Sequence, residues 1–119
     1  MDMIAFSVAN VNRCSDPDGF NHDLNDWTLS DWCTAVLGEL GEAANIIKKM
    51  NRIRDGIRNK ESKDQLETML MDEIADTFIY LDLLAQAAGF SLNDAVIAKW
   101  NAKSNEIGYP HLIWEENIS

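Results

Sequence analysis

The sequence has little that would indicate a membrane-bound or secreted protein. It contains no uninterrupted apolar run of the roughly 20 residues that a membrane-spanning helix needs. Its first residues, MDMIAFSVANVNRC, lack the basic start and the cleavage pattern of a secretory signal peptide. We therefore expect a cytoplasmic protein with no membrane partner.

Cysteine is also scarce, since Cys14 and Cys33 are the only two. Their spacing matches neither a zinc site nor a redox motif, and cytoplasmic thiols are usually reduced. A chain of 119 residues fits one domain, here 1–119, and buries enough surface to be stable without a disulfide. We interpret both cysteines as packing residues.

Basic residues are few: 10 Lys and Arg stand against 20 Asp and Glu, and the net charge is -10. Such a surface repels a polyanion, so we expect no nucleic acid polymer as a ligand. A small anionic substrate is compatible with this net charge if a metal ion or a local basic cluster neutralises the charge of the substrate.

Helical periodicity is the feature that the sequence does have. No segment alternates with β-branched and aromatic enrichment, so we predict an all-α fold without strands. Capping-box patterns begin at Ser62 and Ser91, and Gly56 and Gly89 offer stops. The expected helices cover about 2–12, 28–54, 62–88 and 91–106, with a loop over 14–26 and no clear structure over 111–119.

Each of the two long helices has acids within an apolar stripe. The first stripe is Trp32, Val36, Glu39, Ala43, Ile46 and Met50, and Glu42 borders it. The second stripe is Leu66, Leu70, Glu73, Thr77, Tyr80 and Leu84, and Asp76 borders it. An ionised carboxylate that faces a core is costly unless it is paired or bound to a metal.

A single acid in such a stripe is more often a salt-bridged surface residue than a ligand. Two pairs on helices joined by a short connection favour metal binding, because antiparallel packing brings all four acids together. Carboxylate oxygens suit Mg²⁺, with Mn²⁺ as a substitute. Neither helix has a histidine, which disfavours the alternative of a di-metal oxidase.

Two segments carry a resemblance to a known family. GELGEAANIIKKMNR (38–52) contains Glu-x-x-Glu, and DEIADTFIYLDLLA (72–85) contains Glu-x-x-Asp. In this order they resemble the MazG-like all-α nucleoside triphosphate pyrophosphohydrolase superfamily, which includes dCTP pyrophosphatases and dimeric dUTPases. The resemblance covers about 27–110. It implies magnesium-dependent hydrolysis of a nucleoside triphosphate, with a deoxynucleotide favoured, to the monophosphate and pyrophosphate.

The resemblance also implies roles for particular residues. Glu39, Glu42, Glu73 and Asp76 fall on the metal-ligand positions. Independently of the resemblance, we expect one of these four carboxylates, Glu39 or Glu42, to act as the general base. Tyr80 is a candidate substrate-facing aromatic. The segment 98–110 is similar to an element that carries a lysine and an asparagine toward the nucleotide. Lys99 and Asn101 are the closest matches to this lysine and asparagine. Asn105 is an alternative match for the asparagine, and many relatives have a basic residue at the position of Gly108.

Other residues are candidates for substrate binding. Lys49 shares a helical face with Glu42 and is within reach of a phosphate, although basic runs are usually solvated. Trp27 and His22 lie where relatives place base-stacking groups, whereas Trp32 is better explained as core. Relatives also favour a helical bundle completed as a homodimer or homotetramer. The alternative function is a non-catalytic helical oligomerisation or interaction module that has kept the fold.

Overall fold

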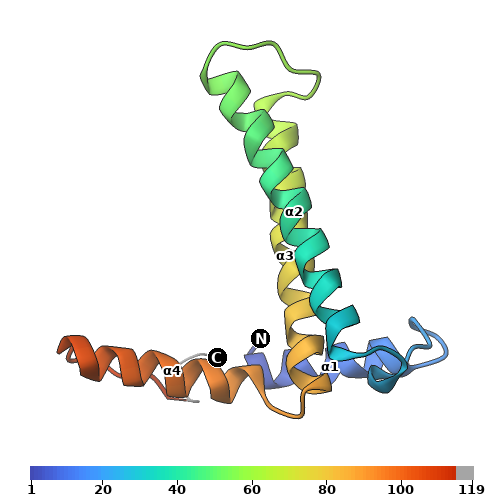
Figure 1. Cartoon of the computed structure of the whole chain (residues 1–119), viewed down its shortest axis with the longest axis vertical. Helices are drawn as coiled ribbons and strands as arrows, with labels where there is room; N and C mark the ends of the chain where they lie inside the picture. The colour runs from blue at the N-terminus through green and yellow to red at the C-terminus, as the bar shows by residue number, and fades with distance from the viewer. Residues whose placement is uncertain (115–119) are drawn as a thin grey trace. The chain divides into compact units, whose positions relative to one another are not determined.

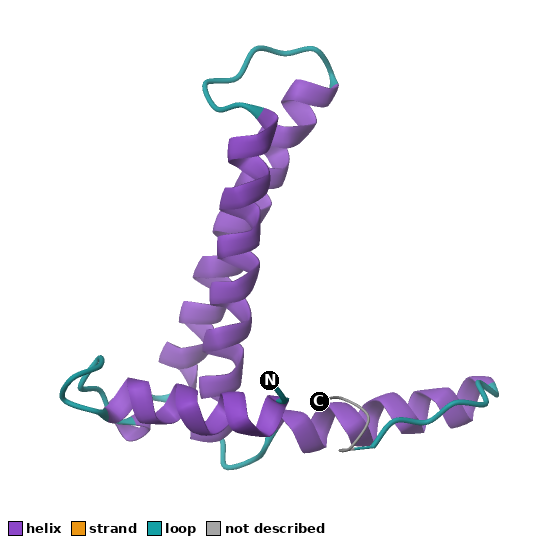
Figure 2. Ribbon diagram, turned by 180° about the vertical axis from the view of Figure 1, so that it is seen from behind, coloured by secondary structure: helices purple, strands orange, loops and turns teal. Residues whose placement is uncertain are grey.

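The computed structural model of the protein describes residues 1–114. Within them the chain forms helices and loops and no strand, which confirms the all-α prediction (Figure 2). The elements are α1 (Met3–Ser15), the 3-10 helix η1 (Leu24–Asp26), α2 (Leu29–Arg54), α3 (Lys63–Ala87) and α4 (Leu92–Ile107). Figure 1 labels the α-helices. None of the described helices combines the length and the apolar character needed to cross a membrane.

The observed boundaries differ from the prediction mainly in the N-terminal region. Helix α1 continues through Cys14 and Ser15, which were expected to lie in a loop. The Ser15 hydroxyl donates to the carbonyl oxygen of Val11 at 2.9 Å, and Pro17 follows the end of the helix. The described part of the tail, 111–114, has no regular structure, as expected, and 115–119 lie outside the described residues.

The chain divides into two compact units, and the boundary falls within α3. The hairpin unit comprises 30–81, and the terminal unit comprises 1–29 together with the chain from Asp82 onward. Trp32, Ala43, Ile46 and Leu66 are buried residues of the hairpin unit, and Cys14, Leu83 and Ala85 are buried residues of the terminal unit. Cys33 is exposed, so its prediction as a packing residue is wrong. One residue after buried Trp32, it points about 100° away around the helix.

Local signals set the ends of the helices in the hairpin unit. At the start of α3, the Gln65 side chain accepts from the Ser62 backbone N–H at 2.8 Å, and the Ser62 hydroxyl accepts from the Gln65 N–H at 3.2 Å. This is the reciprocal pair that the predicted capping box requires. At the end of α2, Gly56 takes a left-handed φ of 77°, and the next N–H returns to the carbonyl oxygen of Arg52 at 2.8 Å.

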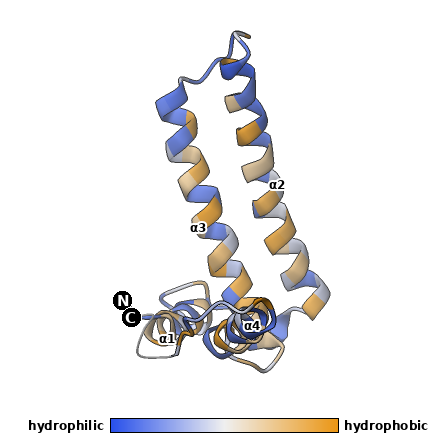
Figure 3. Ribbon diagram, turned by 90° about the vertical axis from the view of Figure 1, so that its left-hand side faces the viewer, coloured by the Kyte–Doolittle hydropathy of each residue, from blue (hydrophilic) through white to orange (hydrophobic). Residues whose placement is uncertain are grey.

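Helices α2 and α3 pack as an antiparallel pair (Figure 3). The Trp32 and Tyr80 rings, with centroids 6.4 Å apart, mark one end of the pair. The Lys49 Nζ atom lies 3.5 Å from a carboxylate oxygen of Glu61 near the other end. Residue numbers therefore rise along one helix as they fall along the other, and the contact between Trp32 and Tyr80 joins the two predicted apolar stripes. Every residue of these stripes is buried or half-buried.

A buried carboxylate organises the terminal unit. Asp82 is 1% exposed and accepts hydrogen bonds from the Ser7 hydroxyl at 2.5 Å, from Asn10 at 2.9 Å and from Gln86 at 2.9 Å. The Gln86 amide also donates to the Ser7 carbonyl oxygen at 2.9 Å. Neutral donors thus satisfy this acid and link α1 to the end of α3.

Replacing Asp82 by Ala should destabilise the protein by about 3 kcal/mol, because the buried Asn10 and the half-buried Ser7 and Gln86 lose their shared acceptor. The free energy of unfolding in urea measures this loss. Glu67→Ala, which removes an exposed acid from the same helix, is the control and should change stability by less than about 0.5 kcal/mol. Equal losses in the two variants would show that the Asp82 network contributes nothing.

Candidate metal centre

Three acids meet at the seam between α2 and α3. Glu39, Glu42 and Glu73 each offer one carboxylate oxygen, and these three oxygens all lie within 4.8 Å of one another. Glu39 and Glu73 are half-buried, and Glu42 is exposed. The structure therefore brings together three of the four acids that the sequence proposed as ligands, from both helices of the hairpin unit.

The fourth acid, Asp76, is exposed and lies outside this triad of oxygens. Its negative charge nevertheless contributes to raising the pKa of Glu42 and the pKa of Glu73. It is thus close enough to add to the repulsion at the seam. Asp76 therefore adds negative charge beside the triad without being one of its three oxygen donors.

The two sets of acids open toward one face of the hairpin. Glu42 follows Glu39 by three residues, and Asp76 follows Glu73 by three, so each is rotated by the same angle around its own helix. Because both helices are right-handed and run antiparallel, equal rotations turn side chains toward the same side of the pair. The exposed acids Asp31 and Asp72 lie on that side as well, and we call it the acidic face.

The triad has no neutralising group among the described residues. None of the ion pairs in this part of the chain includes Glu39, Glu42 or Glu73. The Oε2 atom of Glu73 is buried and has no hydrogen-bond partner. Such an oxygen is unfavourable in a folded protein unless something that the chain itself lacks approaches it.

Mutual contact of the acids perturbs their protonation. The neighbouring Glu39 carboxyl and then burial raise the pKa of Glu73. Contact with the Glu73 carboxyl and its charge raise the pKa of Glu42. Both carboxyls thus hold a proton more readily than isolated ones do, as expected for like charges that share a site.

A divalent cation fits this arrangement. The donors are carboxylate oxygens from two helices, which are the ligands that Mg²⁺ and Mn²⁺ prefer. A cation placed among them would give the orphaned Glu73 oxygen a partner and would offset the repulsion between the three groups. The triad therefore has the chemistry of a metal centre for a hard ion.

The other candidates in the hairpin unit have partners of their own. Lys49 pairs with Glu61 and lies about 10 Å along α2 from Glu42, at 1.5 Å of rise per residue. Glu61 was not singled out from the sequence, because it lies in a loop where no periodicity applies. Tyr80 is half-buried, and its ring is near that of Trp32, which is buried as expected for a core residue.

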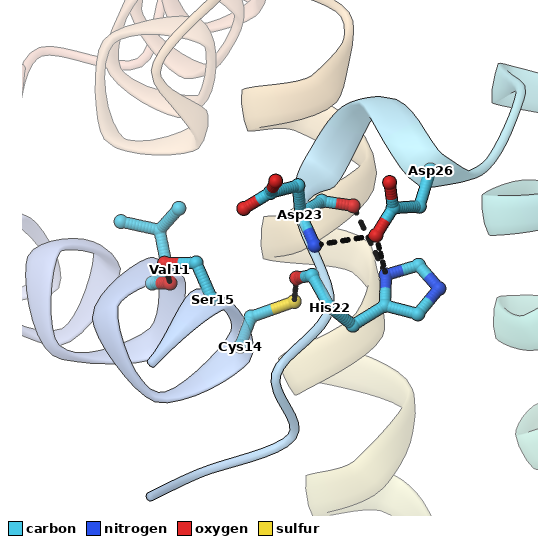
Figure 4. Close-up of polar contacts among 6 residues, drawn as sticks. All are labelled: Val11, Cys14, Ser15, His22, Asp23 and Asp26. Carbon is cyan, nitrogen blue, oxygen red and sulfur yellow. Dashed lines mark hydrogen bonds and ion pairs between the residues drawn. The ribbon is translucent and has the colours of Figure 1, made fainter. Parts of the chain in front are cut away.

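The remaining candidates belong to the terminal unit. His22 and Trp27 make an edge-to-face contact with ring centroids 4.8 Å apart, and Trp27 is 37% exposed. The Nδ1 atom of His22 lies 3.0 Å from the Asp23 carbonyl oxygen and 3.9 Å from a carboxylate oxygen of Asp26 (Figure 4). The neighbouring Cys14 thiol donates to the His22 carbonyl oxygen, and burial raises its pKa, so it is a poor nucleophile.

Lys99 and Asn101 lie on α4. Lys99 is exposed, whereas the Asn101 amide bonds the backbone of Ile113 in both directions. It donates to the carbonyl oxygen at 2.6 Å and accepts from the N–H at 2.9 Å. Asn101 therefore fastens the segment after α4, and this contact across 12 residues has no signature in the sequence.

No protein-family model, curated protein or solved structure matches this chain. The similarity to MazG-like proteins therefore rests on the two acidic motifs themselves.

The raised pKa values predict that the metal-free protein becomes more stable on mild acidification. The folded state binds protons more tightly than the unfolded state at Glu42 and Glu73, so stability falls as pH rises through the raised pKa values. Between about pH 7 and the ordinary carboxyl range near pH 4.5, acidification should therefore raise the free energy of unfolding in EDTA.

Glu73→Gln isolates the contribution of the Glu73 charge to the free energy of unfolding, because glutamine has no charge and nearly the same shape as glutamate. The variant should be more stable than the wild type at neutral pH without metal, and the gap should close as pH falls. Urea unfolding at several pH values measures it, and Glu67→Gln is the control. A Glu73→Gln protein that is less stable than the wild type at neutral pH would contradict the repulsion.

Proposed function

We propose that this protein is a magnesium-dependent nucleoside triphosphate pyrophosphohydrolase that serves nucleotide-pool control or house-cleaning. The observation that carries the proposal is the meeting of Glu39, Glu42 and Glu73 around an orphaned, buried carboxylate oxygen. Asp76 completes the proposed ligand set from the rim. The order and spacing of the two acidic motifs support this reaction over other uses of a magnesium site.

When bound, Mg²⁺ supplies the positive charge that a triphosphate needs in order to approach a chain of net charge -10 and that offsets charge on the leaving pyrophosphate. The chain's own contribution is to hold the ligand oxygens in place. Two rigid helices present them, and the half-buried Glu39 and Glu73 have little freedom to swing away.

The proposed reaction is hydrolysis of the triphosphate chain. The oxygen of a water molecule forms a bond to the α- or the β-phosphorus, and the bond from that phosphorus to the oxygen that bridges the two breaks. The bridging oxygen keeps the electron pair and leaves on pyrophosphate after attack at the α-phosphorus, or on the monophosphate after attack at the β-phosphorus. One acid takes the proton of the water. Glu42 suits this role, because it is exposed on the acidic face, where a water molecule can reach it.

Substrate contacts complete the proposal. Lys49, freed from Glu61, would meet a phosphate, and Tyr80 lies one helical turn beyond Asp76. In the terminal unit, the base-stacking roles of Trp27 and His22 and the nucleotide-binding roles of Lys99 and Asn101 stay predictions from the sequence resemblance. We further propose a cytoplasmic homodimer or homotetramer that binds no nucleic acid polymer.

Activity is tested with Mg²⁺ and a panel of common and modified nucleoside triphosphates, by measuring released pyrophosphate. Glu39→Gln and Glu73→Gln should each lower kcat/KM at least 100-fold, because each removes a charged oxygen donor. Glu67→Gln, on the same helix as Glu73, should stay within about twofold of the wild type. Activity of the two site variants within a few-fold of the wild type would refute the assignment.

Magnesium binding by itself separates the enzyme from a non-catalytic interaction module, which the exposed apolar residues of the hairpin unit make the second candidate. A ligand that binds only the folded state stabilises it by about 2.7 kcal/mol at 100 times its Kd. Millimolar Mg²⁺ should therefore raise the melting temperature of the wild type and of Glu67→Gln, but not that of Glu73→Gln. An unchanged wild-type melting temperature would favour the module.

A further inference from the structure

Most of the positive charge of the protein lies at the loop end of the hairpin unit, where a connection joins α2 to α3 (Figure 1). Seven of the ten basic residues fall within 48–63, namely Lys48, Lys49, Arg52, Arg54, Arg58, Lys60 and Lys63. The same segment has two acids, Asp55 and Glu61, so its net charge is +5, whereas that of the whole chain is -10. The loop end therefore attracts small anions that the rest of the chain repels.

Lys49 is the basic residue of this segment that is best placed to serve the acid triad. It follows Glu42 by seven residues, which is about two turns of the helix, so both residues lie on the acidic face. Side chains on a helix lean toward its N-terminal end, which for Lys49 is the direction of Glu42. Lys48, in contrast, follows Glu39 by nine residues and points to the opposite side of α2 from it.

In the structure Glu61 engages Lys49. The Nζ atom of Lys49 lies 3.5 Å from the Oε1 atom of Glu61, and the two side chains are 32% and 23% exposed. The ion pair between Lys63 and Glu67 at the same end of the hairpin unit is longer, at 3.9 Å, and its side chains are 71% and 50% exposed. Solvent screens the Lys49–Glu61 pair less, so breaking it is the harder of the two.

The loop holds the Glu61 carboxylate in place. The Asn59 amide donates to the Oε2 atom of Glu61 at 3.0 Å and to the Glu61 carbonyl oxygen at 3.2 Å. A hydrogen bond with its own backbone lowers the pKa of Glu61, and the charge of Lys49 and the Asn59 amide lower it further. Glu61 is therefore charged at neutral pH and is presented to Lys49 by the loop.

A phosphate group can take the place of this carboxylate. Both are oxygen anions that accept hydrogen bonds from an ammonium group. About 10 Å of helix rise separates Glu42 from Lys49. A triphosphate with one phosphate at the triad has further phosphates that can extend toward Lys49, and the lysine side chain covers the rest of the gap. Binding of this kind has to break the Lys49–Glu61 ion pair first.

We propose that Glu61 is a positioning residue, which restrains Lys49 at the loop end and thereby lowers the affinity of the site for a triphosphate. A bound triphosphate takes Lys49 from Glu61, and the ion pair forms again when the phosphates leave. The inference rests on the proposed function, because the triphosphate is the ligand that draws Lys49 toward the triad. An ion pair with a purely structural role would close the loop without any effect on phosphate binding.

Calorimetry of inorganic triphosphate binding to the full-length protein, in the presence of Mg²⁺, tests the proposal. Glu61→Gln removes the charge and nearly keeps the shape, so it should bind inorganic triphosphate about three- to fivefold more tightly than the wild type, as expected for one ion pair. Lys49→Gln should bind it more weakly. In the double variant the effect of Glu61→Gln should disappear, because no lysine remains to be released.

Glu67→Gln is the matched control. It removes the same charge from the other Lys–Glu pair of this end and releases Lys63. Lys63 precedes Glu73 by ten residues and therefore points away from the acidic face. The affinity of Glu67→Gln for inorganic triphosphate should stay within about 1.5-fold of the wild type.

Steady-state kinetics separate positioning from catalysis. With a nucleoside triphosphate, Glu61→Gln should lower KM by about the same factor as the dissociation constant and leave kcat within about twofold, because the ion pair acts on binding alone. Circular dichroism checks that each variant remains helical. Asn59→Ala, which removes the amide that holds the Glu61 carboxylate, replaces Glu61→Gln if that variant fails to fold and should change the affinity in the same direction.

Equal affinity of the wild type and a folded Glu61→Gln protein for inorganic triphosphate would overturn the proposal, and so would an equal change with and without Lys49. Loss of activity in Glu73→Gln together with no change in Glu61→Gln would leave the proposed function intact. Tighter binding by Glu61→Gln in a protein that hydrolyses no nucleotide would support the ion-pair exchange and refute the enzyme. A wild type that binds no inorganic triphosphate would contradict both.

Discussion

The α2–α3 pair must hold together against the repulsion between carboxylates at its seam, and this requirement constrains the whole hairpin unit. Glu39, Glu42 and Glu73 are held together although no basic side chain of the described chain neutralises them. Apolar packing on both sides of the acids must therefore oppose their separation. The Trp32–Tyr80 contact lies toward one end of the pair, and the Lys49–Glu61 ion pair closes the other. Such strain is typical of sites where function, and not stability, has set the residues.

Asp82 shows that the fold can satisfy a buried acid when the role is structural. Its carboxylate receives hydrogen bonds from Ser7, Asn10 and Gln86, all of them neutral donors. Glu73 lies nine residues earlier on the same helix, yet one of its oxygens is buried with no donor at all. The two acids thus differ in their surroundings, and the oxygen of Glu73 that has no donor suits the cation that we propose.

Helix handedness places the acids and the exposed apolar residues of the hairpin unit on opposite sides. Acids that follow a residue of an apolar stripe by three positions and apolar residues that follow it by one position point to opposite sides. Because the two helices are antiparallel, each set points to the same side on both helices. One hairpin thus has its acidic face on one side and exposed apolar residues such as Leu37 and Ile74 on the other.

The sequence by itself determined the helices, their caps and the apolar stripes, because hydrophobic periodicity and capping are local properties of a few neighbouring residues. It also determined that acids from two helices would converge, since a short connection forces antiparallel pairing. Only the tertiary structure decided that Asp82 would be the acid held by Ser7, that Asn101 would fasten Ile113, and that Lys49 would pair with Glu61. These partners lie on different helices or in loops, where no periodic pattern specifies which side chains meet.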